Sequence, residues 1–198
     1  MIVDRLITAP NDEPVLLNEM REVLGITRDD DTARDRILQS RLYAAIEYCQ
    51  DYCNVCFVEQ TRRLYSPSFY NRFIVKPNLQ SVTSITYIDN NDNLQTVLPS
   101  TYIVDTVRSQ VVLKNGESWP ADVADHPNAV SIEYVAGEND TDNIPSAIKE
   151  AIKFIVIQWE NYQDSLSSPD TSTTINTVPY AVKQLLDVYR NYRVNNYA

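Results

Sequence analysis

The chain has 198 residues, of which 43% are hydrophobic and 22% are charged, and its formal net charge is −10. This composition is typical of a globular protein with its own core and excludes a disordered chain. A negative surface repels phosphate, which argues against sequence-specific DNA binding, and only three glycines argue against a glycine-rich phosphate loop. No apolar run is long enough for a membrane span, and the N-terminus lacks the pattern of a signal peptide. We therefore expect a protein made in a reducing cytoplasm.

Two helices are predicted in the first quarter of the chain, over residues 14–24 and 31–54. Gly25 is suited to ending the first, and Asp30 or Asp31 to capping the second. The apolar face of the first helix consists of Leu17, Met20, Val23 and Leu24. The apolar stripe of the second consists of Ile37, Leu38, Leu42, Ala45, Ile46, Cys49 and Cys53.

After Asn54 the apolar period changes from helical to alternating, which predicts strands. The strand-like runs are CFVEQTRRLYS, RFIVK, LQSVTSITYID, TYIVD, QVVLK and AVSIEYVAG. Residues 89–93 supply a hairpin turn after the third run, in which Ile85 and Tyr87 share one face. Residues 57–136 are therefore expected to form antiparallel sheet.

Helical spacing returns over residues 145–162, where the buried stripe is predicted to be Ile148, Ala151, Ile152, Ile155, Trp159 and Tyr162. A polar loop and a last helix from Pro179 follow. This order of helices, then strands, then helices predicts an α+β protein, mainly a helical bundle with an inserted antiparallel β-subdomain. Its expected parts are N-terminal helices in 1–56, the β-subdomain in 57–137, and C-terminal helices and tail in 138–198 that form one compact unit with 1–56.

Three cysteines, Cys49, Cys53 and Cys56, lie within eight residues. A zinc site would need a fourth ligand, and His126, the only histidine, lies far along the chain. A redox cysteine normally lies at a helix N-terminus, whereas these lie at the end of a predicted helix. Buried structural thiols are the favoured interpretation, and a metal site is the alternative.

Other candidate sites have simpler explanations. Residues 89–93 and 138–143 resemble fragments of calcium loops but lack the required glycine and glutamate, so a turn and a helix cap are favoured. His126 is expected to face solvent, without a catalytic companion. Trp119 and Trp159 could form a stacking platform for sugars or bases, but core or interface positions are favoured. No catalytic, metal or cofactor site is predicted, and we expect no enzyme.

Taken in order, the motifs of the chain resemble the head–tail connector proteins of tailed bacteriophages, also called adaptors or head-completion proteins. The matching segments, from Glu13 to about Arg190, are EPVLLNEMREVLGI, AAIEYCQDYCN, KPNLQSVTSITYID, LPSTYIVD, GESWPADVADHPNAVSIEYVAG, IPSAIKEAIKFIVIQWENYQ and VKQLLDVYR. The family run P-L-x-S-V-x-x-I-x-Y is matched by Leu79, Ser81, Val82, Ile85 and Tyr87. The cysteine cluster departs from the family, whose members often carry smaller residues there.

The resemblance implies a structural protein of the virion neck, made of copies of this chain in a ring, often a dodecamer, below the portal protein. Such a ring extends the DNA channel, lets genomic DNA pass without sequence recognition, and offers a platform for the tail or a tail-completion protein. An acidic channel wall would repel phosphate, although ordinary solubility charge explains the acidity equally well. The alternatives are a DNA-packaging accessory factor and a tail-associated β-module that binds a receptor or sugar.

The last segment of the chain is basic and aromatic, with Lys183, Arg190 and Arg193 against one acid, Asp187. Tyrosine and arginine are common at binding hot spots. Because the resemblance implies that the C-terminal end grips the portal, the predicted portal-binding residues are Tyr189, Arg190, Tyr192, Arg193 and Tyr197. The alternative is a frayed end without a partner.

Overall fold

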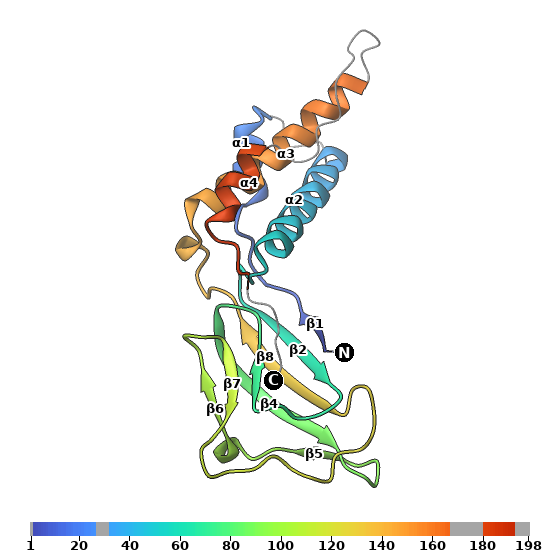
Figure 1. The fold of residues 1–198 in the computed structure, drawn as a ribbon. Coiled ribbons are helices and arrows are strands. Elements are labelled where there is room, and N and C mark those ends of the chain that lie inside the picture. The colour runs from blue at the N-terminus through green and yellow to red at the C-terminus, as the bar shows by residue number, and fades with distance from the viewer. Residues whose placement is uncertain (1, 27–31, 167–179, 193–198) are drawn as a thin grey trace. The chain divides into compact units, whose positions relative to one another are not determined.

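The computed structural model describes residues 2–26, 32–166 and 180–192. These residues divide into two compact units. Of the described residues, the β unit contains 2–12, 55–139 and 192, and the helical unit contains 13–26, 32–54, 140–166 and 180–191. Among the described residues there are four α-helices, all in the helical unit, and eight strands, all in the β unit (Figure 1).

The prediction of a mainly helical bundle is therefore wrong. The strands form two antiparallel sheets rather than a minor insertion. The physical reason is that the strands bury their apolar residues against one another. Leu64, Phe73, Ile85, Val111 and Ile132 belong to one buried cluster within the β unit. The sheet region therefore has a hydrophobic core of its own and is not a minor insertion in a helical bundle.

The larger sheet has five strands in the order β1-β2-β8-β4-β5. Their bounds are Val3–Thr8 for β1, Gln60–Ser66 for β2, Val130–Ala136 for β8, Leu79–Ile88 for β4 and Leu94–Thr96 for β5. In β8 the alternate residues Val130, Ile132, Tyr134 and Ala136 are fully buried, as their spacing predicted. Strand β1 was not predicted from the sequence.

The smaller sheet has three strands in the order β3-β7-β6. Their bounds are Arg72–Ile74 for β3, Gln110–Leu113 for β7 and Tyr102–Asp105 for β6. All strand pairs in both sheets are antiparallel, so the prediction of antiparallel sheet over residues 57–136 is confirmed. Trp119 packs at the edge of this core, stacked on Phe69 with 4.8 Å between ring centroids.

The two ends of the long β segment are hydrogen-bonded to each other. The Glu138 N–H donates to the Phe57 carbonyl, and the Glu59 N–H donates to the Glu138 carbonyl, both at 3.0 Å. Gly137 lies at this crossing with φ +115°, and a Cβ there would lie 2.1 Å from the carbonyl oxygen of Val58. Only glycine lets the two backbones approach so closely.

The turn at residues 89–93 is built around one buried carboxylate, as expected for a turn rather than a calcium loop. Asp89 Oδ1 accepts the N–H groups of Asn91 at 2.8 Å and Asn93 at 2.9 Å, and Asp89 Oδ2 accepts Gln95 Nε2 at 2.8 Å. These hydrogen bonds hold the pKa of Asp89 below its ordinary value of 3.8, and the bond from the Asn93 N–H has the largest effect. The predicted cap in residues 138–143 is also present, since Asp140 accepts the Asp142 N–H beside the 3₁₀ helix Thr141–Asn143.

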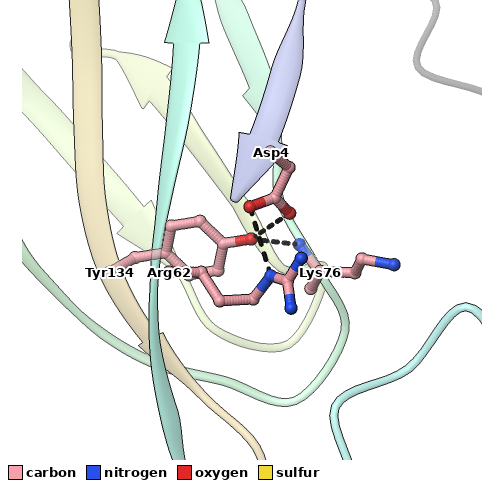
Figure 2. A network of polar contacts seen from close by, with 4 residues as sticks. All are labelled: Asp4, Arg62, Lys76 and Tyr134. Carbon is pink, nitrogen blue, oxygen red and sulfur yellow. Dashed lines mark hydrogen bonds and ion pairs between the residues drawn. The ribbon is translucent and has the colours of Figure 1, made fainter. Parts of the chain in front are cut away.

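The N-terminal strand β1 is held to the sheet by a polar network (Figure 2). The buried Tyr134 hydroxyl donates to Asp4 Oδ2 at 2.6 Å and accepts the Lys76 backbone N–H at 3.3 Å. Arg62 Nε donates to Asp4 Oδ1 at 3.2 Å. Burial raises the pKa of the Tyr134 phenol, and the negative charge of Asp4 raises it further. The phenol therefore remains protonated and donates its hydrogen bond to Asp4. One carboxylate thus fastens β1 to both β2 and β8.

In the helical unit, α1 spans Leu17–Val23, α2 spans Thr32–Cys53, α3 spans Ser146–Leu166 and α4 spans Tyr180–Asp187. Most of the predicted stripe of α2 is buried, but Ile37 is 51% exposed. Val23 is also half exposed, and Val15, just before α1, is buried instead. The predicted caps Asp30 and Asp31 lie outside the described residues.

Ion pairs join the helices at partly exposed positions. Arg21 Nη2 lies 2.7 Å from Asp35 Oδ2, Lys153 Nζ lies 3.2 Å from Glu19 Oε2, and Arg41 pairs with Glu160. Partly exposed pairs orient helices more than they stabilise them. Across the described ranges no helix is long and apolar enough to cross a membrane.

Replacing Asp89 with asparagine is expected to lower the free energy of unfolding at neutral pH. Because the pKa of Asp89 is depressed in the folded state, its stabilising contribution is complete above the unfolded value, near 3.8, and is lost as pH falls through the folded value. The difference between the parent protein and Asp89→Asn should therefore shrink below pH 3.8. Urea unfolding measured across acidic and neutral pH checks this, and a difference independent of pH contradicts it.

Removing the carboxylate that fastens β1 is expected to destabilise the β unit. Asp4→Ala leaves the buried Tyr134 hydroxyl and the Arg62 guanidinium without their shared acceptor, which should cost about 2 kcal/mol. Urea unfolding measures this loss. The control Arg5→Ala, at an exposed position of the same strand, should change stability by less than about 0.5 kcal/mol. Equal effects of the two substitutions would show that the network does not hold the strand.

Candidate functional site

The predicted portal-binding residues follow helix α4. Tyr189 is half-buried, Arg190 is exposed and Tyr192 is 67% exposed. Arg193 and Tyr197 lie outside the described residues. The structure therefore places three of the five predicted residues in one short segment, next to Val188, which is 82% exposed.

This segment is fastened to the C-terminal end of α2. Helix α4 buries Val182 and Leu186, and Cys53 Sγ contacts the Leu186 carbonyl at 3.8 Å. Beyond the helix, the Asn191 N–H donates to the Cys53 carbonyl at 2.8 Å. Asn54 has a left-handed backbone, with φ 55°, and its Nδ2 donates to the Asn191 carbonyl at 3.5 Å. The end of α2 thus fixes the path of the chain as far as Asn191.

Tyr52 makes two further contacts with the same segment. Its hydroxyl donates to Asp187 Oδ1 at 2.6 Å, and the Arg190 guanidinium lies over its ring, 4.8 Å from the centroid. Tyr48, one turn earlier in α2, stacks on Tyr52 with 6.1 Å between centroids. A guanidinium held over an aromatic face in this way is pre-oriented while keeping its charge.

Sequence reasoning did not identify Tyr52, Asn54 or Asp187 as part of this site. The available signal was the spacing of Tyr48 and Tyr52, which places both rings on one side of a helix. Their partner Arg190 is 138 positions after Tyr52 in the sequence, and one sequence alone does not show that pairing.

All three cysteines are buried, as predicted, and none forms a disulfide. Cys49 and Cys53 belong to the helical unit and Cys56 to the β unit. Burial raises the pKa of Cys49 to about 12 and that of Cys53 to about 11, and it also raises the pKa of Cys56. Thiols in this state are poor nucleophiles and poor metal ligands at neutral pH.

The other residues with possible chemistry are used within the fold. His126 is exposed in a loop, as predicted, and its Nδ1 accepts the Asn128 N–H at 3.1 Å. Trp119 donates its indole N–H to the Tyr70 carbonyl at 2.9 Å and packs on the core. Within the described ranges, no group of three or more His, Cys, Asp or Glu side chains is placed to hold a metal ion.

Comparison with solved structures shows a fold found in particle necks. The chain superposes on a chain of the "Neck of empty GTA particle computed with C6 symmetry" with a TM-score of 0.74, 18% identity and 98% coverage of both chains. For the "Neck of native GTA particle computed with C12 symmetry" the TM-score is 0.71, with 18% identity and 98% coverage of both chains. For the "Virion of native gene transfer agent (GTA) particle" it is 0.72, with 17% identity and coverage of 98% and 97%.

Comparison with curated proteins found no match. A family model described as "Head completion protein" matches residues 15–192, which include most of the β unit and nearly all of the helical unit. Since that match extends over far more than half of the sequence, the family resemblance predicted from the motifs is confirmed, and the chain belongs to the head completion protein family.

Proposed function

We propose that this head completion protein is a structural connector in the neck of a phage-like particle, between the head and the tail. The observation that carries the proposal is the family match over residues 15–192. The shared fold with neck chains of gene transfer agent particles supports the same location. In this proposal several copies form a closed ring below the portal protein, and tail or tail-completion proteins assemble on the ring.

A ring is consistent with the C6 and C12 symmetry used for the particle necks that share this fold. In a cyclic ring each subunit contacts its neighbours through two different surfaces, and the contact closes on itself after a full turn. The net charge of −10 suits a channel through which DNA passes without sequence recognition, because a negative wall does not retain phosphate. The role is structural and involves no catalytic step.

The segment after α4 is the proposed portal anchor. Tyr192 and Val188 are largely exposed, and Arg190 is held over Tyr52 with its charge facing solvent. Exposed aromatic and arginine side chains on a fixed backbone bind at a lower entropy cost than the same residues on a free chain. The proposed portal-binding residues are Tyr189, Arg190, Tyr192, Arg193 and Tyr197.

The stoichiometry on the portal tests the connector proposal. Purified portal oligomers mixed with this protein should gain several copies, related by cyclic symmetry, because a ring closes only when each subunit contacts two neighbours. Native mass spectrometry measures the mass of the complex. One copy per portal oligomer, or no binding, would contradict the proposal. Binding of this protein to free DNA, without binding to the portal, would favour the alternative of a DNA-packaging accessory factor.

Truncation tests the anchor separately from the ring. Removing residues 192–198 leaves the contacts of Arg190 and Asn191 with α2 in place, so the thermal unfolding midpoint should stay the same. Portal binding, measured by co-sedimentation, should fall by about tenfold or more if a hot spot is lost. The control Tyr180→Ala removes a tyrosine that is 75% exposed at the other end of α4, and it should bind normally. Unchanged portal binding by the truncated protein would rule out Tyr192, Arg193 and Tyr197 as portal-binding residues.

A further inference from the structure

Helix α2 has an exposed outer face that no described residue covers. At 100° per residue, eight positions of α2 fall within about 60° of Ser40, on one side of the helix. All eight are exposed, and they are Ala33, Arg36, Ile37, Ser40, Tyr43, Ala44, Glu47 and Asp51. We call this set the α2 outer face.

The α2 outer face carries two large apolar side chains that are exposed. Ile37 and Tyr43 are each 51% exposed. Between them lie Ser40 and Ala44, whose small side chains let another helix approach closely. An exposed aliphatic and an exposed aromatic side chain beside small residues are typical of a packing surface.

The charges on this face are separated along the helix. Arg36 lies toward the N-terminal end, whereas Glu47 and Asp51 lie toward the C-terminal end. Among the described residues, the side chains of Arg36, Glu47 and Asp51 have no ion-pair or hydrogen-bond partner. An arrangement that is basic at one end and acidic at the other is complementary to itself when two copies run antiparallel.

We propose that the α2 outer face binds the same face of a second copy of this chain, with the two helices antiparallel about a two-fold axis. With Arg36 opposite Glu47 of the partner subunit, Ser40 lies opposite the partner's Tyr43. Ile37 then lies within one turn of that tyrosine. A parallel pairing would instead place Arg36 beside the partner's Arg36 and acid beside acid, which is repulsive.

This dimer is distinct from the proposed ring and does not depend on it. A two-fold contact uses the same surface on both subunits, whereas neighbours in a cyclic ring use two different surfaces. The dimer is therefore a form of the free protein, and it separates before or during incorporation into a ring. It also covers the apolar face of α2 while the protein is free.

Charge exchange tests the antiparallel register. Sedimentation equilibrium of the parent protein at low salt should show a monomer–dimer equilibrium. Arg36→Glu should raise the dissociation constant about tenfold or more, because two attractive pairs become repulsive, and the double variant Arg36→Glu with Glu47→Arg should restore it. The control Lys114→Glu makes the same charge change at an exposed position of the β unit and should have no effect.

Cross-linking tests the geometry independently. In the proposed register the two copies of Ser40 are offset by three residues, or about 4.5 Å along the helix axis, within reach of a disulfide. Ser40→Cys should therefore form a covalent dimer under mild oxidation, whereas the control Ser118→Cys, exposed in the β unit, should not. A parent protein that stays monomeric up to about 1 mM overturns the proposal, as does a dimer that Arg36→Glu leaves intact or that Ser40→Cys does not cross-link.

Discussion

Strand β8 is the element on which the β unit depends. It pairs along its whole length with β2 on one side and with β4 on the other, and its inward side chains are fully buried. One of them, Tyr134, also fixes Asp4 of the N-terminal strand. Directly after β8, Gly137 lets the returning chain cross residues 57–59 at backbone contact distance. Loss of β8 would therefore separate β1 and β2 from β4 and β5, and it would remove the Tyr134 hydrogen bond to Asp4.

The β unit is closed by its own hydrogen bonds where the chain enters and leaves it. The segment that enters the β unit after Asn54 and the segment that ends it at Glu138 are hydrogen-bonded to each other, so joining them needs no contact from a neighbouring subunit. The helical unit also has buried residues of its own, and Tyr52 and Asn54 contact the segment that follows α4. Two self-sufficient units suit a protein that is made free and is then built into a particle.

The sequence predicted those elements whose apolar residues repeat regularly. Alternation from Val130 to Ala136 predicted β8, and helical spacing predicted most of the buried face of α2. It did not predict β1, because its outer four residues are exposed and its pairing partner, β2, lies more than 50 positions later. The runs RFIVK, TYIVD and QVVLK did predict the short strands β3, β6 and β7. The helical share of the fold was nevertheless overestimated, because a sequence pattern does not show that two sheets share one buried core.

The composition of the C-terminal segment predicted the candidate site, but it did not predict the arrangement of the side chains there. Tyrosine and arginine at the C-terminal end suggested a binding segment, but a composition does not reveal that Arg190 already lies over Tyr52. The most direct test of a neck connector is electron cryo-microscopy of particles assembled with this protein. Repeated copies between portal and tail, each with the helices and both sheets described above, are the predicted result. A complete neck that lacks this chain, or the chain found only on the tail surface, would contradict the account.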